Sequence, residues 1–306
     1  TYIYIAIRRG PMAVPTDATE VFAIDTQVNQ DPPLFDSGFP VDFALTRNVS
    51  STANWAVGSR LIQGKQLQTN LTNAESSNPV FEFDFMDGWN SETLSTNSNV
   101  YSWMWKRAPS FCDVVAYTGN GTAGRTVSHN LGVAPEMMWL KPRSTGEWVV
   151  YHKDLGATHR LHLDKTNASA AYSGFFNDTT PTDSVFTLGS DVGINGSGSN
   201  YIAYLFASLD GVSKVGSFTA GSSDTFVDCG FSSSARFVLM KRSSGTGDWF
   251  VYDSERGYVA GTGDKRLKLN TTGAETTNNN IDPTAGGFTV TGNTIDAGTY
   301  IFYAIA

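Results

Sequence analysis

The apolar positions of this chain fall in short segments of β-strand character that recur at a fixed distance. Four aromatic segments begin at Tyr2, Tyr101, Tyr201 and Tyr300, so consecutive segments lie 99, 100 and 99 residues apart. Segment 201–207 is apolar on both faces, which is typical of a central strand in a sandwich. No window carries a convincing apolar period of 3.6 residues over helical length. The pattern therefore predicts a repeated all-β structure.

Three further elements recur between the aromatic segments, in the same order each time. A hydrophobic run that ends in a basic residue leads to a tryptophan, in 43–47 with Trp55, in 137–141 with Trp148 and in 237–241 with Trp249. A second element follows each tryptophan, at 65–69, 159–163 and 265–269. A third precedes each closing aromatic segment, at 81–85, 186–188 and 288–290. Each repeat thus offers about six short strands bounded by turn residues, a spacing typical of a β-sandwich.

The recurrence predicts an all-β tandem array of three β-sandwich domains of about 100 residues each. The last strand of a preceding repeat is expected at the N-terminus. The expected boundaries are 1–10 for that closing strand, 11–31 for a linker, and 32–110, 111–209 and 212–306 for the three repeats. Because a repeat of this length is a domain in its own right, we expect the domains to follow one another in a row. A start inside a repeat suggests that the chain belongs to a longer array.

Charge and composition exclude some classes of partner. Lys and Arg number 21 against 29 Asp and Glu, so the net charge is 21 − 29 = −8, which argues against nucleic acid. No run of 18 apolar residues occurs, so no membrane insertion through a spanning helix is expected. Cys112 and Cys229 are far apart and lack zinc-ligand spacing, so we expect free, buried thiols.

The three recurrent tryptophans are the binding candidates that the sequence offers. An exposed Trp55, Trp148 or Trp249 could stack on a sugar ring, and exposure on a concave face would favour a lectin. The competing interpretation places all three in the core, because they lie among Val and Phe and recur at one repeat position. We favour the core, and binding residues otherwise stay unknown.

The sequence offers little for catalysis or metal binding. All four histidines, His129, His152, His159 and His162, lie in the middle repeat, so no catalytic histidine is shared. His159 and His162 stand three apart on an expected strand and would face opposite sides. No nucleophile elbow, P-loop or dinucleotide fingerprint occurs. We expect no catalytic residue, no metal and no cofactor.

Two groups of residues with side-chain oxygens are candidate sites. Asp183, Asp191 and Asn195 could offer oxygen ligands to Ca²⁺, but their spacing matches no calcium motif, and turn formation explains them. Asp84 and Asp87, near Trp89, could form the carboxylate pair of a glycoside hydrolase. Phe83 and Asp84 have no acidic counterpart in the other repeats, so a depolymerising enzyme is the least favoured reading.

Three strings of residues carry a resemblance. They are 8–12 (RRGPM), 103–109 (WMWKRAP) and 129–138 (HNLGVAPEMM). With them the chain resembles, over nearly its whole length, uncharacterised repeat-bearing virion structural proteins of marine tailed bacteriophages, including cyanophages. The resemblance implies a virion protein of the tail or a fibre and transfers no catalytic or ligand residue. The third repeat departs from the last of these strings, 129–138, with Asp228 and Cys229 at the turn where that string has HNLG.

The favoured function is a non-enzymatic structural and adhesive protein of a bacteriophage virion, located in the virion or outside the cell. Its expected partners are other copies of itself or other virion proteins, with host surface polysaccharide as a further partner. Two alternatives stay open at this point: a lectin-like carbohydrate-binding module, and a bacterial extracellular surface fibre built from the same domains.

Overall fold

The computed structural model describes residues 12–27, 31–62, 64–77, 81–91, 97–261 and 263–306. Strands make up nearly all of its regular structure, so the predicted all-β class is confirmed. The helices are one-turn segments: η1 (Ala18–Glu20), η2 (Arg60–Ile62), α1 (Ser173–Phe176) and α2 (Val192–Asn195). No helix in these ranges is long and apolar enough to cross a membrane. The closing strand expected over 1–10 lies outside the described residues.

Each repeat contains one large antiparallel sheet with the same strand order. In every case the first strand of the repeat is at one edge and pairs with the last strand of the repeat. The last strand also pairs with the hydrophobic strand that ends in a basic residue, and the strands that follow this one in the sequence complete the sheet. The sheet of the first repeat is β1 (Phe22–Gln27), β7 (Asn97–Trp105), β3 (Phe43–Asn48), β4 (Ala56–Ser59) and β5 (Leu67–Gln68). That of the second is β8 (Cys112–Thr118), β15 (Asn200–Phe206), β10 (Met137–Pro142), β11 (Val149–His152), β12 (His159–His162) and β13 (Ala170–Ala171). That of the third is β16 (Ser213–Ala220), β24 (Gly298–Ile305), β18 (Phe237–Arg242), β19 (Trp249–Asp253), β20 (Asp264–Lys268) and β21 (Thr276–Asn278).

A small sheet covers one face of each large sheet. The small sheets are β2 (Phe35–Asp36) with β6 (Gly88–Trp89), β9 (Arg125–Ser128) with β14 (Val185–Leu188), and β17 (Thr225–Asp228) with β23 (Gly287–Val290) and β22 (Ile281–Thr284). Each pair of sheets encloses its own hydrophobic cluster. In the second repeat, for example, Phe186 of β14 and Met138 of β10 belong to one cluster. Each repeat is therefore a small sandwich.

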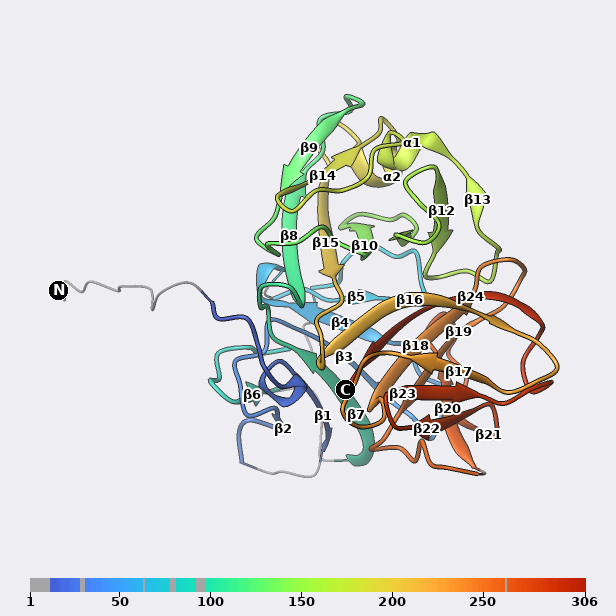
Figure 1. The fold of residues 1–306 in the computed structure, drawn as a ribbon. Helices are drawn as coiled ribbons and strands as arrows, with labels where there is room; N and C mark the ends of the chain where they lie inside the picture. Colours follow the sequence, from blue (N-terminus) through green and yellow to red (C-terminus); the bar gives the residue numbers. More distant parts are fainter. Residues whose placement is uncertain (1–11, 28–30, 63, 78–80, 92–96, 262) are drawn as a thin grey trace.

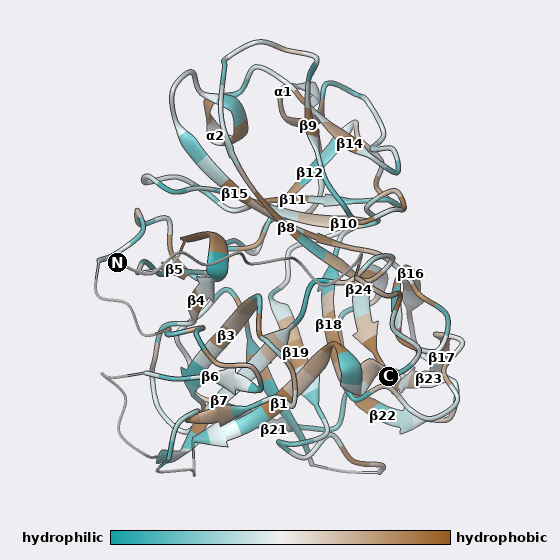
Figure 2. Cartoon of the chain, turned by 90° about the vertical axis from the view of Figure 1, so that its left-hand side faces the viewer, coloured by the Kyte–Doolittle hydropathy of each residue, from teal (hydrophilic) through white to brown (hydrophobic). Residues whose placement is uncertain are grey.

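The other face of each large sheet packs into a core shared by all three repeats. Along β15, Ile202, Tyr204 and Phe206 enter this shared core, whereas Tyr201 and Leu205 face the sandwich interior. Strand β24 alternates in the same way between the shared core and its own sandwich. This double burial explains why these segments carry apolar residues at every position. In Figure 2 the hydrophobic colour accordingly gathers along β15.

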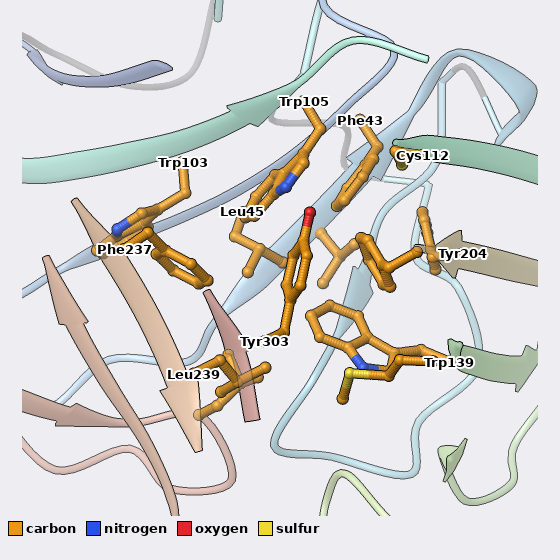
Figure 3. Close-up of a cluster of buried hydrophobic side chains, with 14 of the residues drawn as sticks. Phe43, Leu45, Trp103, Trp105, Cys112, Trp139, Tyr204, Phe237, Leu239 and Tyr303 are labelled. Carbon is orange, nitrogen blue, oxygen red and sulfur yellow. The ribbon is translucent and has the colours of Figure 1, made fainter. Parts of the chain in front are cut away.

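The three repeats are grouped around this common core, rather than in the row that we expected (Figure 1). Figure 3 shows aromatic side chains of all three meeting there: Trp103 and Trp105 from the first repeat, Trp139 and Tyr204 from the second, and Tyr303 from the third. Phe43 of the first repeat packs against Tyr204 of the second, with ring centroids 4.8 Å apart and ring planes tilted by 50°. The repeats therefore bury each other's apolar faces.

The prediction that segment 11–31 is a linker is wrong. The segment contains η1 and β1, and β1 pairs antiparallel with β7 along Phe22–Trp105 and Ile24–Trp103. In strand order, β1 is the counterpart of β8 and β16. The first large sheet therefore begins about ten residues before the expected boundary at residue 32.

Candidate functional site: the seams between the repeats

The recurrent tryptophans lie where two repeats meet, a contact region that we call a seam. Trp55, Trp148 and Trp249 are each 0 % exposed. Each indole Nε1–H donates to a backbone carbonyl of another repeat: Trp55 to Lys268 at 2.9 Å, Trp148 to Gln68 at 2.8 Å, and Trp249 to His162 at 2.9 Å. The acceptors occupy one repeat position, directly after the buried leucine of the neighbouring strand.

This burial decides the role of the three binding candidates. A fully buried indole offers no face to a sugar ring, so Trp55, Trp148 and Trp249 cannot form the concave aromatic surface that would favour a lectin. Their hydrogen bonds run from the first repeat to the third, from the third to the second, and from the second to the first. The three seams therefore close a ring with approximate threefold symmetry.

A buried cation strengthens each seam, at the basic residue that ends the hydrophobic run. Lys141 and Lys241 are 0 % exposed and Arg47 is 3 % exposed. Across the seams, Lys141 Nζ donates to the Asn73 carbonyl at 3.1 Å, Lys241 Nζ to the Thr166 carbonyl at 3.1 Å, and Arg47 Nη2 to the Gly273 carbonyl at 2.8 Å. Burial lowers the pKa of each lysine to about 8, and it lowers that of Arg47 to about 10 with help from the charge of Arg256.

Each seam also contains a hydrogen bond between backbone groups of the two repeats that meet there. The amide N–H of Ala53 donates to Thr272, that of Gly146 to Thr72, and that of Gly247 to Thr166. Because the partners are main-chain groups, the seams tolerate different side chains around them. The repeated set of contacts holds the three sandwiches in one body.

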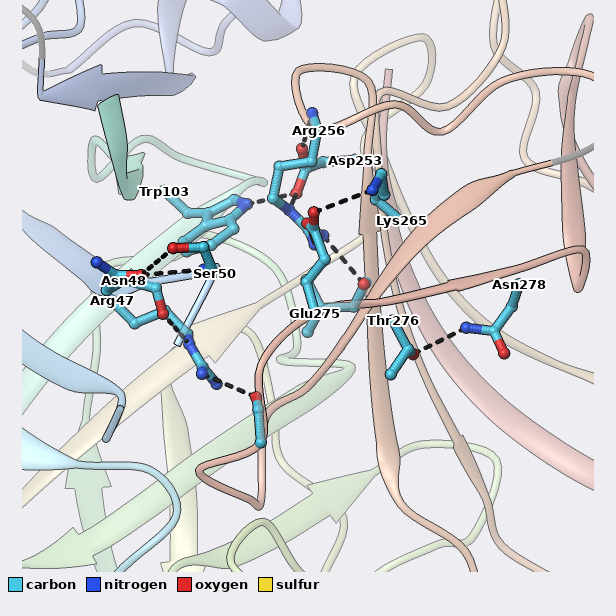
Figure 4. A network of polar contacts seen from close by, with 12 residues as sticks. Arg47, Asn48, Ser50, Trp103, Asp253, Arg256, Lys265, Glu275, Thr276 and Asn278 are labelled. Carbon is cyan, nitrogen blue, oxygen red and sulfur yellow. Dashed lines mark hydrogen bonds and ion pairs between the residues drawn. The ribbon is translucent and has the colours of Figure 1, made fainter. Parts of the chain in front are cut away.

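The seam between the first and third repeats adds a network of charged side chains (Figure 4). Arg256 Nε donates to Asp253 Oδ2 at 2.6 Å, and both side chains are almost fully buried. Trp103 of the first repeat donates its Nε1–H to the same carboxylate at 2.9 Å. Glu275 accepts from Arg256 at 3.3 Å and lies 3.5 Å from Lys265. The network joins β7 to β19 through groups that are satisfied by one another.

The four histidines do not converge. His152 is buried, and its Nδ1 accepts the backbone N–H of Asp154 at 3.2 Å. His129 likewise accepts the N–H of Leu131, and His159 contacts Thr158. His162 lies 3.2 Å from Glu147. Among the described residues, no group of three or more His, Cys, Asp or Glu could hold a metal ion.

In the two candidate groups of residues with side-chain oxygens, Asp191, Asn195 and Asp87 make local structural contacts. Asp191 accepts the N–H of Gly193 at the start of α2, and Asn195 is buried and bridges Thr122 and Gly189. Trp89 is buried and donates to the hydroxyl of Ser102. The nearby Asp87 accepts two backbone N–H groups of the 37–38 turn through its carbonyl. Cys112 and Cys229 are free and buried, as expected.

A pocket that the sequence pattern does not indicate lies on the seam between the second and third repeats. It has a volume of about 590 Å³ and is lined by Glu147, Arg160, His162, Lys165, Asn167 and, from the third repeat, Thr246, among others. Glu147 accepts a hydrogen bond from Lys165. Burial lowers the pKa of His162 to about 4 against the opposing charge of Glu147, so this imidazole is neutral at pH 7. No sequence motif marks the pocket, because its walls come from two repeats.

A smaller pocket of about 220 Å³ lies at the corresponding place of the third repeat. It is lined by Arg266, Lys268 and Thr271, among others. The strand registers pair Leu161 with Val150 and Leu267 with Val251, which makes Arg160 and Arg266 equivalent positions. In the first repeat Leu67 pairs with Val57, so Gln66 stands at that position.

Fold and seams together define an all-β protein of three sandwich repeats that close around one shared core. The family described as Domain of unknown function (DUF7483) matches residues 37–306, and the chain belongs to this family. No curated protein matches the chain.

Proposed function

We propose that the chain is a non-enzymatic structural and adhesive protein of a bacteriophage virion, in the tail or a fibre. The observation that carries the proposal is the closed ring of seams, in which buried side chains such as Trp148 and Lys141 join one repeat to the next. A rigid body of this kind suits assembly, because it holds several surfaces at fixed positions. The resemblance to virion proteins of marine phages points in the same direction.

The proposed mechanism rests on many weak contacts. Loops of small polar residues, such as 221–224 (GSSD) and 291–294 (TGNT), lie at one end of the small sheet of the third repeat. Once one loop touches a surface, the fixed geometry raises the effective concentration of the others. The partners in this proposal are further copies of the chain, other virion proteins and host surface polysaccharide.

The electrostatics of the interior support a structural role. Several buried charged groups hold repeats together, as Asp253 does in the first–third seam by accepting from Trp103 and pairing with Arg256. The ammonium groups of Lys141 and Lys241 donate hydrogen bonds to backbone carbonyl oxygens. These groups are tied to the scaffold, whereas a general acid or base must reach a substrate.

Two experiments test this proposal. Purified phage particles and the surface of the bacterial cells should be examined separately with an antibody against the chain. Labelling of the particles is expected, whereas labelling confined to the bacterial surface would favour the bacterial fibre instead. The purified chain should also be retained on host cells while host polysaccharide keeps its length. A time-dependent shortening of the polymer that disappears on changing a single Asp or Glu would refute the non-enzymatic role.

A carbohydrate-binding function is the second candidate, and the pocket at Glu147 and Arg160 is the observation that favours it. Binding there would not use the recurrent tryptophans. It would also be compatible with a place in the virion.

A further inference from the structure

We infer that the pocket on the second–third seam binds the carboxylate of an acidic saccharide, with Arg160 as the group that recognises it. The inference rests on the proposed adhesive function and names the kind of surface polymer that one site of the chain would contact. The pocket's volume of about 590 Å³ is in the range of pockets that hold small organic ligands.

The position of Arg160 carries the argument. Its guanidinium lies over the ring of Tyr172, 4.2 Å from the centroid, and 5.4 Å from that of Phe175. These rings fix the plane of the group. Among the described residues, no acceptor takes a hydrogen bond from Arg160 and no carboxylate forms an ion pair with it. A planar guanidinium held in this way presents its donors in the fork that matches a carboxylate.

The other charged groups of the pocket leave this role to Arg160. Glu147 is occupied by Lys165 and lies beside His162. Although burial raises the pKa of Glu147, the hydrogen bond from Lys165 and the charges of Lys165 and Arg160 lower it overall, so Glu147 is ionised at pH 7. Asp164, the residue before Lys165, does not line the pocket, and its carboxylate accepts the backbone N–H of Trp148. With His162 neutral, Arg160 and Lys165 outweigh Glu147 by one positive charge in the lining, in a chain of net charge −8.

The remaining lining suits a sugar. Asn167, Ser169 and Thr246 bring amide and hydroxyl groups to the rim, and such groups pair with the hydroxyls of a sugar ring. Ser169 is held in place because its N–H and its hydroxyl both donate to the carbonyl of Ser243 across the seam. The site therefore depends on the second and third repeats being joined.

The repeats themselves supply the test variants. Gln66 stands at the equivalent position of the first repeat, so Arg160→Gln introduces a residue that this fold already carries there. Arg266→Gln is the matched control. Arg266 lies over Phe250 at 4.5 Å, and its Nη1 already donates to Asn280 Oδ1 at 2.9 Å within the third repeat.

The experiment is a calorimetric titration of the full chain with tetrasaccharides of glucuronate, galacturonate and mannuronate, and with their methyl esters, up to about 10 mM. At least one free acid should bind, its ester should bind at least about tenfold more weakly, and Arg160→Gln should weaken binding at least about tenfold. Arg160→Lys, which keeps the charge and loses the fork, should give an intermediate affinity. Arg266→Gln should bind within about twofold of the unaltered chain.

Three results would overturn the inference: no binding by any of the three acids, equal binding of acid and ester, or unchanged binding by Arg160→Gln in a chain whose melting curve shows that it is folded. The adhesive function is tested separately, by retention of the same variants on host cells. Loss of uronate binding with cell retention intact would show that adhesion uses another surface. Retention that is absent from the start would refute the adhesive function and leave the measured uronate binding in place.

Discussion

The indole nitrogen of Trp148 donates a hydrogen bond to the backbone carbonyl of Gln68, 2.8 Å away in another repeat. The side chain is fully buried, and its backbone N–H is held by Asp164 at 3.1 Å. One tryptophan therefore contributes both to the shared core and to the seam. Because Trp55 and Trp249 do the same at the other seams, the position recurs for a reason of architecture.

Replacing Trp148 by Phe should destabilise the protein by more than its volume change explains. The variant keeps an aromatic ring but leaves the Gln68 carbonyl without its donor, which adds about 1–2 kcal/mol. Trp139→Phe is the control, because Trp139 is also buried but its Nε1 has no hydrogen-bond partner. Urea unfolding of both variants measures the difference. Equal losses would contradict a specific role for the seam hydrogen bond.

Replacing Lys141 by Met should lower the free energy of unfolding by about 2–3 kcal/mol. The ammonium group donates to the carbonyls of Asn73, Pro142 and Ser144, and methionine leaves these oxygens without a donor. Lys141→Arg should lose less, because Arg47 occupies the corresponding place in the first repeat. Thermal unfolding followed by circular dichroism measures whether the stability decreases in the order parent, Lys141→Arg, Lys141→Met. A methionine variant as stable as the parent would show that the lysine contributes nothing to the seam.

Changing Asp253 to Asn should cost about 3–5 kcal/mol, because it leaves the buried guanidinium of Arg256 without its closest counter-charge. The second change, in Asp253→Asn/Arg256→Met, should recover part of that loss, since it removes the uncompensated charge. Denaturant unfolding of the single and double variants gives the coupling. If the double variant is less stable than Asp253→Asn, the ion pair is not the source of the loss.

Lowering the pH from about 6.5 to about 4 should destabilise the fold through His152. Burial lowers the pKa of this histidine to about 4 in the folded chain, against about 6.5 when unfolded. The unfolded state therefore binds more protons within this window, and the free energy of unfolding falls as the pH falls, with about 2–3 kcal/mol of the fall coming from His152; His162, whose pKa is also lowered to about 4, adds to it. His152→Asn keeps an acceptor for the Asp154 N–H and should flatten this slope in urea titrations. An unchanged slope would contradict the assignment.

The two cysteines should resist alkylation until the chain unfolds. Burial raises the pKa of the Cys229 thiol to about 12 and that of Cys112 well above its ordinary value. The reactive thiolate is therefore scarce in the folded protein, and both sulfurs are also shielded. Iodoacetamide labelling followed by mass spectrometry, with and without urea, should show modification only in urea. Rapid labelling of the native chain would show that the surrounding core opens.

Part of this architecture could be predicted from the sequence because it depends on side chains. The aromatic segments that begin at Tyr101, Tyr201 and Tyr300 mark closing strands that the structure confirms, and the recurrent tryptophans Trp55, Trp148 and Trp249 mark the buried position. Strand β1 was missed because its second half, Asp25 to Gln27, is polar and hides the pattern that β8 and β16 show. Pairing with β7 gives this segment its strand structure.

The closure of the ring could not be predicted, because its acceptors are backbone carbonyls. The carbonyls of Gln68, His162 and Lys268 serve the same purpose although their side chains differ. Nothing in the residue types at these positions indicates a shared role. The pocket at Arg160 was missed for a related reason, since Thr246 reaches it from the next repeat. Both features depend on the relative placement of repeats, which a repeat pattern alone leaves open.

The ring also constrains the order in which the chain can be completed during synthesis on the ribosome. Lys141 reaches Asn73 across 68 residues and Lys241 reaches Thr166 across 75, so these two seams join neighbouring repeats. The hydrogen bond from Arg47 to the Gly273 carbonyl, which closes the third seam, can form only after 226 further residues have been synthesised. Until then the nascent first and second repeats expose the apolar faces that the third will cover, and nascent chains stalled before that point should depend on chaperones to stay soluble.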